Sequence, residues 1–261
     1  MKPFFWNTLR QRCHIPHSDR NEVCLVEGRN GRLYPGVRVE NISYPLSVDA
    51  VQAAIFSCLS EGDTPKKLLI PESGTDSIHG EERSEEKYGM KYPDQWNRAW
   101  IEWYRLDVST HPEREPLDGE RLFVTTENSI SAGRLKKLTS HCVIPHSDFP
   151  VTALLLTDIG VFSGVNIEVP DWQKGLCAER VALAKAISCG ATKFQEIHVY
   201  APMGDYVSPC GACRQVMAEH MNHGQVTLYN ADMDITILKV GDLLPYQFMA
   251  SGLKKSSLKN E

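Results

Sequence analysis

The alternation of hydrophobic and polar positions predicts the same series of elements twice along the chain. In each half a short amphipathic helix is followed by two strands, a longer helix and a third strand. The first series is expected at Phe4–Arg12, Val23–Glu27, Leu33–Glu40, Ser47–Ser60 and Lys67–Ile70. The second is expected at Ser131–His141, Ala153–Thr157, Gly160–Glu168, Leu176–Ser188 and Glu196–Tyr200. Strands that alternate with helices predict an α/β layered fold.

After the third strand the two series differ. The first continues through a polar stretch, expected to be a surface loop, into a tryptophan-rich helix and a last strand: Glu72–Lys91, Gln95–Leu106 and Arg121–Thr126. The second continues through one more helix and two strands: Ser208–His220, Val226–Tyr229 and Ile235–Val240. The two halves are therefore expected to be related without being identical.

Repeated motifs support this division. The segment Cys13–Asp19 (CHIPHSD) recurs 129 residues later as Cys142–Asp148 (CVIPHSD), and Gly36–Glu40 (GVRVE) recurs 128 residues later as Gly164–Glu168 (GVNIE). Two matches at nearly one spacing indicate a tandem duplication. We expect two domains, at residues 1–127 and 128–261.

Composition and charge exclude several classes of protein. Hydrophobic residues make up 42% of the 261 residues and charged residues 23%, as in soluble globular proteins. No apolar run reaches the roughly 18 residues of a membrane span. Lys and Arg number 16 against 21 Asp and Glu in residues 1–127, and 12 against 12 in residues 128–261. Neither half is basic, which argues against a nucleic acid polymer as partner.

The N-terminal residues lack the apolar core of a secretory signal, so a cytoplasmic location is expected. In that compartment the eight cysteines are expected to be thiols or metal ligands rather than disulfides.

Three of these cysteines have the spacing of a metal site. Cys210 and Cys213 form a Cys-x-x-Cys pair at a predicted helix start, and Cys177 precedes another helix 33 residues earlier. Ser208 is the expected N-cap of the later helix, with Pro209 at its first position. Three protein ligands with an open fourth position are typical of a catalytic zinc site. We expect one Zn²⁺ per chain.

Two charged residues follow Cys177 directly in the sequence. Glu179 is placed to exchange a proton with water at the open position, although a carboxylate that merely suits the helix N-terminus is the alternative. Arg180 is expected to donate to a ligand sulfur and offset the excess negative charge of three thiolates, unless it is an ordinary solvated helix residue.

Cys-Ala-Glu-Arg followed by Pro-Cys-Gly-Ala-Cys-Arg-Gln-Val resembles the nucleoside cytidine deaminase family, over residues 131–248. The resemblance implies three-layer αβα domains with mixed sheets, and a hydrolase that acts on a cyclic amidine C–N bond. It implies Cys177, Cys210 and Cys213 as zinc ligands and Glu179 as the proton shuttle. It assigns substrate contacts to Phe149, Asn166, Glu168 and Ala178.

The strand pattern agrees in part with these assignments. Asn166 and Glu168 stand two residues apart on a strand and so share one face, where they could bind a sugar hydroxyl. An ordinary polar strand face is the alternative for that pair, and a plain core position is the alternative for Phe149.

The first half lacks this chemistry. Alignment of the repeats places Asp49 where the second half has Cys177 and Val51 where it has Glu179. Arg38 takes the place of Asn166, and Arg20 that of Phe149. We expect the first half to bind no zinc and to be catalytically inactive.

The first half nevertheless keeps a segment around Ser43 and Tyr44 that resembles the one with which tetrameric relatives reach a neighbouring active site. Phe248, near the C-terminus, resembles an aromatic with a similar role. The resemblance implies a homodimer that forms a pseudo-tetramer of four deaminase-like domains, with these residues contributed in trans. An inert scaffold is the alternative role for the first half.

These expectations lead to one function and its alternatives. The leading interpretation is zinc-dependent deamination of cytidine or deoxycytidine to the uridine nucleoside, in pyrimidine salvage. The alternatives are a deaminase of another aminopyrimidine nucleoside, with a modified base or of antibiotic type, and a non-catalytic zinc-bearing binding protein. A polynucleotide editor is disfavoured because the chain has no basic stripe.

Overall fold

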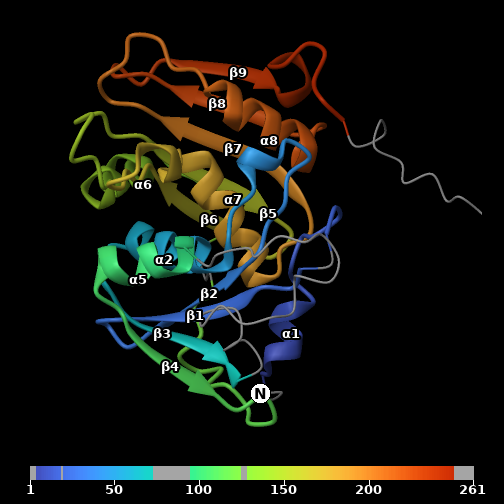
Figure 1. Ribbon diagram of the computed structural model, residues 1–261. Helices are drawn as coiled ribbons and strands as arrows, with labels where there is room; N and C mark the ends of the chain where they lie inside the picture. Colours follow the sequence, from blue (N-terminus) through green and yellow to red (C-terminus); the bar gives the residue numbers. More distant parts are fainter. Residues whose placement is uncertain (1–3, 19, 73–94, 125–127, 250–261) are drawn as a thin grey trace, which may run out of the picture.

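The fold is seen in a computed structural model that describes residues 4–18, 20–72, 95–124 and 128–249. Two mixed sheets lie one above the other, with helices between and around them (Figure 1). The N-terminal sheet has the order β2-β1-β3-β4 and comprises β1 (Val23–Gly28), β2 (Leu33–Val37), β3 (Pro65–Pro71) and β4 (Asp107–His111). The C-terminal sheet has the order β6-β5-β7-β8-β9 and comprises β5 (Thr152–Thr157), β6 (Gly160–Val165), β7 (Phe194–Tyr200), β8 (Gln225–Tyr229) and β9 (Ile235–Lys239).

The two sheets share one pairing scheme. In each, the first two strands form an antiparallel hairpin, the third strand pairs antiparallel with the first, and the fourth runs parallel to the third. A parallel bridge outside the strands also recurs, between His14 and Val39 in one half and between Val143 and Ile167 in the other. The repeated sequence motifs thus occupy corresponding places in the two halves.

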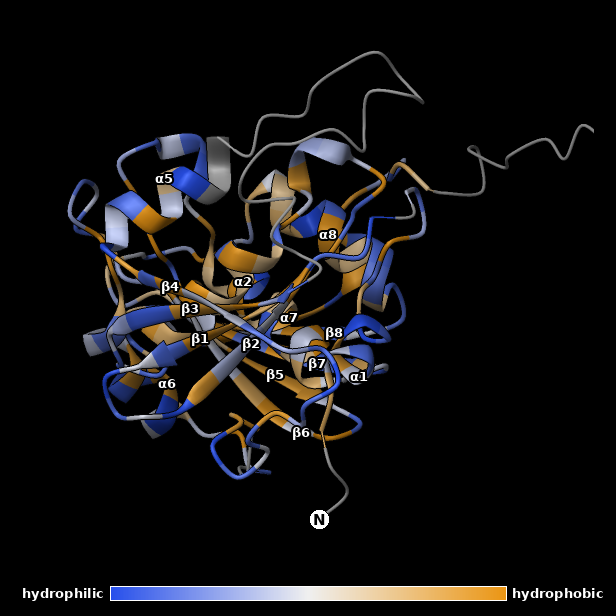
Figure 2. Ribbon diagram, turned by 60° about the horizontal axis from the view of Figure 1, so that its bottom comes forward, coloured by the Kyte–Doolittle hydropathy of each residue, from blue (hydrophilic) through white to orange (hydrophobic). Residues whose placement is uncertain are grey.

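The helices of the two halves correspond in the same way. The N-terminal half has α1 (Trp6–Arg10), α2 (Ala50–Ser60), α5 (Gln95–Tyr104) and the 3₁₀ turn η1 (Tyr44–Leu46). The C-terminal half has α6 (Ala132–Leu138), α7 (Ala178–Cys189), α8 (Gly211–Met221) and the 3₁₀ turns η3 (Thr139–His141), η4 (Trp172–Lys174) and η5 (Val240–Asp242). Hydrophobic residues are concentrated in the strands and on the helix sides that face them (Figure 2).

In the C-terminal half the helices cover both faces of the sheet. Leu155 and Ile197, from β5 and β7, lie beside side chains of α7 and α8. Thr152 lies three positions from Leu155 and therefore points to the other face. Its Oγ1 donates to the Leu135 carbonyl of α6 at 3.0 Å, so α6 covers that face. A helix–sheet–helix sandwich therefore supports α7, which carries Cys177 at its start.

A glycine on the second strand of each hairpin brings the central helix close to the sheet. A Cβ placed on Gly164 would lie 2.1 Å from the Ala178 carbonyl oxygen, and one on Gly36 would lie 2.0 Å from that of Ala50. No side chain fits at either contact, because backbone atoms fill the space. The start of α7, and with it the Cys177 position, is therefore held directly against β6.

The two halves pack through α2 and α7 in opposite orientations. In Figure 1, β7 and β8 point to the left while β3 and β4 point to the right. Matching hydrogen bonds cross the boundary. Arg180 Nη2 donates to the Leu46 carbonyl at 2.8 Å, and Gln52 Nε2, at the aligned position, donates to the Lys174 carbonyl at 2.6 Å. The two halves thus make matching contacts across their boundary.

A buried charged cluster adds to this boundary. The Lys185 ammonium of α7 is fully buried and lies 2.5 Å from Glu61 Oε1, just after α2. It also donates to Ser60 Oγ and Ser163 Oγ, each at 2.8 Å. Burial alone would raise the pKa of Glu61, but Lys185 and the Ser163 hydroxyl outweigh it, and the net pKa is lowered. The cluster ties the end of α2 to the middle of α7.

The structure corrects several predicted elements. The strand predicted at Arg121–Thr126 is wrong, because in its described part only Leu122 makes a bridge, to Leu33. The strand parallel to β3 is instead Asp107–His111, which the pattern did not predict. The predicted surface loop Glu72–Lys91 lies outside the described residues except for Glu72. Among the described helices, none combines the length and the apolarity needed to cross a bilayer.

Candidate active site

The starts of α7 and α8 bring three thiols together. Cys177 is the N-cap residue of α7 and Cys210 that of α8, and the Sγ of Cys210 accepts the backbone N–H of Cys213 at 3.4 Å. The prediction that Ser208 caps this helix is therefore wrong. Arg214 instead holds that segment outside the helix, since it donates to Ser208 Oγ at 2.5 Å and to the Pro209 carbonyl at 2.8 Å. Two of the three sulfurs thus lie at helix N-termini, which favour negative charge.

The spacing of the sulfurs fits a zinc ion. The Cys210 Sγ lies 3.6 Å from that of Cys177 and 3.4 Å from that of Cys213. Thiolates that bind Zn²⁺ at about 2.3 Å in a tetrahedron lie about 3.8 Å apart. Hydrogen bonding among the three thiols lowers the pKa of Cys210 and raises the pKa of the other two. The donor set and its geometry therefore match a three-sulfur zinc site.

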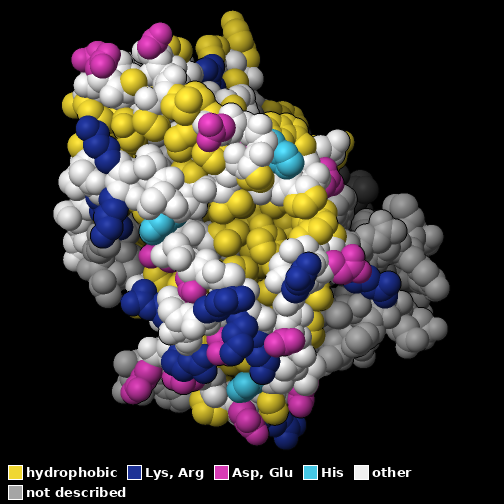
Figure 3. All heavy atoms as spheres, turned by 90° about the vertical axis from the view of Figure 1, so that its left-hand side faces the viewer, with side chains coloured by type: hydrophobic (Ala, Val, Ile, Leu, Met, Phe, Trp, Pro, Cys, Tyr) yellow, Lys and Arg dark blue, Asp and Glu magenta, His cyan; other side chains and the backbone are white. Residues whose placement is uncertain are grey.

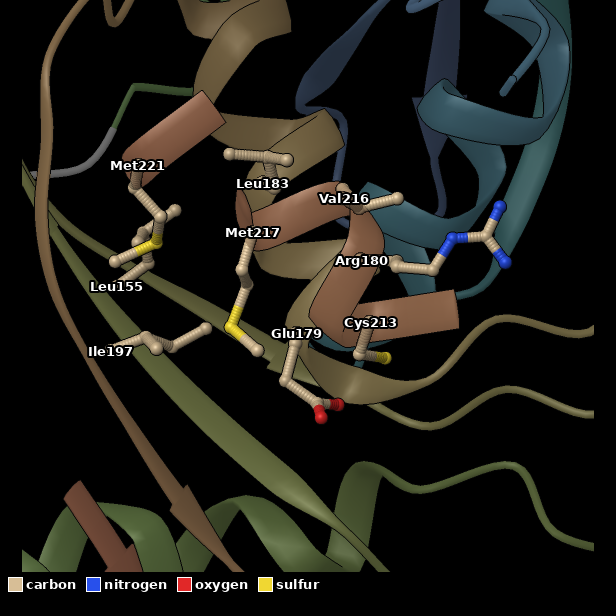
Figure 4. A pocket seen from close by; sticks show the side chains of 9 residues that line it. All are labelled: Leu155, Glu179, Arg180, Leu183, Ile197, Cys213, Val216, Met217 and Met221. Atoms are coloured by element: carbon tan, nitrogen blue, oxygen red, sulfur yellow. The ribbon is translucent and has the colours of Figure 1, made fainter. Parts of the chain in front are cut away.

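Glu179 lies beside this cluster with a free oxygen. Its side chain is buried, and its Oε2 has no hydrogen-bond partner among the described residues. The Glu179 and Cys213 side chains project to the same side, next to a small cavity otherwise lined mostly by apolar side chains such as Met217 and Leu155 (Figure 4). Burial is the main reason that the pKa of Glu179 is raised to about 7. A buried carboxylate with one unpaired oxygen is suited to exchange a proton with a bound molecule.

A pocket of about 440 Å³ opens onto Cys177, Cys210 and Glu179. It lies at the carboxyl end of β7, where ligands commonly bind in α/β sheets. Figure 3 shows the face of the molecule toward which β7 and β8 point, with hydrophobic side chains gathered in its middle. Three aromatic side chains that line the pocket are exposed: Phe149, Trp172 and Tyr206. The pocket thus combines a polar, sulfur-rich end with aromatic side chains.

Glu168 and Asn166 also line the pocket, but their surroundings differ. Glu168 Oε2 accepts the backbone N–H groups of His146 at 2.8 Å and Ser147 at 3.2 Å. Burial raises the pKa of Glu168, but these hydrogen bonds and one from the Ser147 hydroxyl outweigh that effect and lower it overall. The Asn166 amide is engaged at both ends. Oδ1 accepts from Val151 N at 2.9 Å, and Nδ2 donates to the Phe149 carbonyl at 2.8 Å. Asn166 therefore positions the Phe149 segment.

The remaining candidate residues lie outside the lining of this pocket. Ala178 is the first residue of α7 and is fully buried. Arg180 points away from the Glu179 carboxylate (Figure 4), and its Nη2 donates to Leu46 rather than to a sulfur. Ser43, Tyr44 and Phe248 do not line it within this chain, and Tyr44 is 85% exposed. Donation from Arg180 to sulfur stays a prediction, as do the contributions in trans.

Several polar and aromatic residues that line the pocket were missed in the sequence, among them Ser147, Trp172, Tyr206 and Ser208, as well as the neighbouring Val207. Tyr206, Val207 and Ser208 precede the Cys210 motif directly, so closeness in sequence to a ligand was a usable signal. Trp172 had no such signal, because it lies in none of the motifs singled out in the sequence. Its ring makes an edge contact with His146, with 6.1 Å between the centroids.

Among the residues that the structure describes, the corresponding place in the N-terminal half holds no thiol cluster. Asp49 caps α2 by accepting Gln52 N at 2.7 Å, and its other oxygen accepts Trp100 Nε1 at 3.1 Å. Arg38 pairs with Glu40 at 2.9 Å and with Glu22 at 3.3 Å. In the described part of the chain, neither of the two groups of potential metal ligands includes these residues. Arg38 and Glu40, which are aligned with the pocket residues Asn166 and Glu168, thus pair with each other in this half.

Comparison with known proteins gives consistent results. The sequence model "Cytidine and deoxycytidylate deaminase zinc-binding region" matches residues 130–228. A cytidine deaminase of Sporosarcina psychrophila is 42% identical over 120 residues, which are 45% of this chain and 88% of the relative. One of Halalkalibacterium halodurans is 44% identical over 112 residues, 42% of this chain and 85% of the relative. A cytidine deaminase structure from Burkholderia pseudomallei shares 36% identity at a TM-score of 0.43, covering 46% of this chain and 100% of that one.

The zinc-binding match and the sulfur cluster define a hydrolytic deaminase that uses zinc. The similarity to relatives covered over most of their length identifies it more closely. The chain belongs to the cytidine deaminase family.

Proposed function

We propose that this protein hydrolyses cytidine or deoxycytidine at C4 of the base, with the uridine nucleoside and ammonia as products. One observation carries the proposal. Three thiols with zinc spacing and a buried Glu179 carboxylate, whose Oε2 has no partner among the described residues, meet beside one pocket. The similarity to bacterial proteins named cytidine deaminase supports the choice of substrate.

Cys177, Cys210 and Cys213 would hold the zinc ion. Bound there, zinc supplies Lewis-acid activation of a water molecule. Glu179 Oε2 would take one proton from the water whose oxygen adds to C4 and pass it to N3 of the base. It would then move the remaining proton of that oxygen to the amino group, which leaves as ammonia while the C4 carbonyl forms. Because the Glu179 side chain is buried, bulk water is excluded from this proton exchange.

Glu168 and Phe149 would bind the nucleoside. Two backbone N–H groups hold Oε2 of Glu168, so Oε1 can accept a hydrogen bond from a ribose hydroxyl. The exposed ring of Phe149 offers an apolar surface for the base, and Asn166 fixes the loop that carries it. In this scheme Asn166 would contact the substrate directly, and it would also hold in place the loop whose Phe149 ring packs on the base.

The N-terminal half would be a degenerate, non-catalytic copy spanning residues 1–127, with the catalytic domain at 128–261. Its matching strand pairing and its ion pairs at Arg38 and Asp49 support this division. Two chains would associate as a homodimer with four deaminase-like domains. The exposed Tyr44, with Ser43, and the exposed Phe248 would then face a neighbouring active site. The protein would act in cytoplasmic pyrimidine salvage.

Turnover of defined substrates tests the proposal. Purified protein is incubated with cytidine, deoxycytidine or free cytosine, and ammonia and the uracil product are measured. Both nucleosides should react, and cytosine should react far more slowly because it lacks the sugar that Glu168 binds. Cys213→Ser should lose zinc and turnover, whereas Cys142→Ser, a thiol outside the cluster, should keep both. The proposal would be refuted if the zinc-loaded protein released ammonia from neither cytidine nor deoxycytidine.

A further inference from the structure

A second group of potential metal ligands lies away from the pocket, where the two halves meet. It consists of His14, from the segment before β1, and of Glu219 and His220, from the last turn of α8. One ligand atom of each lies within 4.8 Å of the others. His17 lies at the edge, with its Nε2 4.0 Å from Glu219 Oε1. His14, Glu219 and His220 are called the histidine cluster below, and His17 is not counted in it.

The His220 ring is oriented by the Asn41 side chain, which is itself held by a hydrogen bond. Its Nε2 lies 3.1 Å from Asn41 Oδ1, and that oxygen is fixed as the acceptor because Asn41 Nδ2 donates to the Leu46 carbonyl at 3.0 Å. A ring nitrogen facing an amide oxygen must carry the proton, which leaves Nδ1 of His220 with a free lone pair. Metal-binding histidines typically donate their other N–H in this way, and the contact fixes their tautomer.

Glu219 and His14 are also held in place. Both oxygens of Glu219 face the backbone N–H of Ile42, at 3.1 and 2.9 Å, which leaves lone pairs available on each oxygen. The backbone of His14 pairs with Arg38 and Glu40 through two hydrogen bonds of 3.0 and 2.7 Å. The rings of His14 and His220 approach to 4.7 Å between centroids. The donors are thus brought together by both halves before any ion binds.

The electrostatics of the two rings agree with this geometry. Burial is the main cause that lowers the pKa of His14, and His17 lowers it further while Glu40 opposes the change. Burial likewise lowers the pKa of His220 to about 3. Both imidazoles are therefore neutral at pH 7, and neutral imidazole is the form that binds metal ions.

We propose that the histidine cluster binds one divalent transition-metal ion, with His17 near enough to serve as a further ligand. Two imidazoles and a carboxylate suit ions of intermediate softness such as Zn²⁺, Co²⁺ and Ni²⁺, and do not suit Mg²⁺ or Ca²⁺. This site is separate from the thiol cluster and its metal content is additional to the one zinc expected there. It stands whether or not the proposed deaminase function is correct.

Such an ion would join the two halves of the chain. Its ligands come from residue 14 on one side and from α8 on the other. It would also fix Asn41, which bonds to the Leu46 carbonyl, and that same carbonyl accepts Arg180 Nη2 from α7. The ion would therefore stabilise the contact between the N-terminal half and the helix that begins at Cys177.

Cobalt titration of the full-length protein carrying one equivalent of Zn²⁺ per chain, which fills the thiol cluster and leaves the histidine cluster open, tests this site. Co²⁺ bound to thiolates shows an intense sulfur-to-metal charge-transfer absorption, whereas Co²⁺ bound by imidazole and carboxylate does not. The parent should take up one Co²⁺ per chain without that absorption, and its melting temperature should rise. His14→Ala and His220→Gln should each weaken this binding by at least about 10-fold, and Asn41→Ala by about 10- to 100-fold.

The control is His223→Ala, an exposed histidine next to the cluster in sequence, which should bind Co²⁺ like the parent. A far-ultraviolet circular dichroism spectrum like that of the parent shows that a variant is folded, and this control does not depend on the proposed function. The proposal is wrong if the parent takes up Co²⁺ only with the thiolate absorption. It is equally wrong if a folded His14 or His220 variant binds Co²⁺ as tightly as the parent.

Discussion

Replacing Lys185 by methionine should destabilise the protein strongly, although this residue lies outside the pocket. Its ammonium group is fully buried and contacts Glu61, Ser60 and Ser163 at 2.5 to 2.8 Å. Methionine keeps most of the aliphatic chain but removes the charge and all three hydrogen bonds. The Glu61 carboxylate, whose side chain is 25% exposed, then remains between the two halves without its partner.

The size of the effect follows from the burial of the pair. Removing one member of a buried ion pair costs about 3–5 kcal/mol, because the other charge stays desolvated. The partial exposure of Glu61 lets water reach it, so the lower end, about 3 kcal/mol, is expected. For a chain of this size that corresponds to a fall in Tm on the order of 10 °C. The double variant Lys185→Met/Glu61→Leu should recover much of the loss, since no unpaired charge remains.

Urea unfolding at pH 7, followed by tryptophan fluorescence and far-ultraviolet circular dichroism, measures this free energy. Lys193→Met is the matched control, because that lysine is exposed in the same half, and it should change the free energy of unfolding by less than about 0.5 kcal/mol. A Lys185→Met protein within 1 kcal/mol of the parent would show that the buried cluster does not hold the halves together.

Three further predictions concern the same boundary and the proposed partner chain. The folded pKa of Glu61 is lowered from 4.5, so its stabilising effect should be complete above pH 4.5 and should decline as the pH falls through the folded pKa. In acid unfolding curves, the difference in stability between the parent and Glu61→Gln should therefore shrink as the pH falls. Arg12→Ala, which removes a 2.9 Å hydrogen bond to the Ser188 carbonyl near the end of α7, should cost about 1 kcal/mol in urea unfolding, and no change would refute that contact. Tyr44→Ala should lower kcat/KM with the zinc content unchanged, and unaltered kinetics would exclude its contribution in trans.

The zinc ligands were predictable because the metal imposes a local sequence pattern. A Cys-x-x-Cys pair at a helix start places two sulfurs together whatever the rest of the fold does. Cys177 and Glu179 are likewise close together at the start of a second helix because they are two residues apart in the sequence. The error lay in the exact start of α8. A cysteine is an uncommon N-cap, so the usual preference for serine pointed to Ser208 instead of Cys210.

Features that depend on long-range packing were not predictable in this way. β4 (Asp107–His111) is a polar edge strand with little buried surface, so it carries none of the alternation that marks a strand. Glu219 and His220 gave no signal as potential ligands, because His14 meets them only after the two halves have packed. The role of Lys185 was not predictable either, because the helix sequence around it does not show that the Glu61 carboxylate of the other half contacts its ammonium group.

The most direct test of the proposed chemistry is the rate of ammonia release from cytidine by the parent and by Glu179→Gln, with the zinc content of the thiol site measured in both. Glutamine preserves the size of the side chain but cannot carry the proton. The variant should therefore keep its zinc and lose at least about 100-fold in kcat. A Glu179→Gln protein that retains zinc and releases ammonia at the parental rate would contradict the role assigned to this carboxylate, and with it the proposed catalytic mechanism.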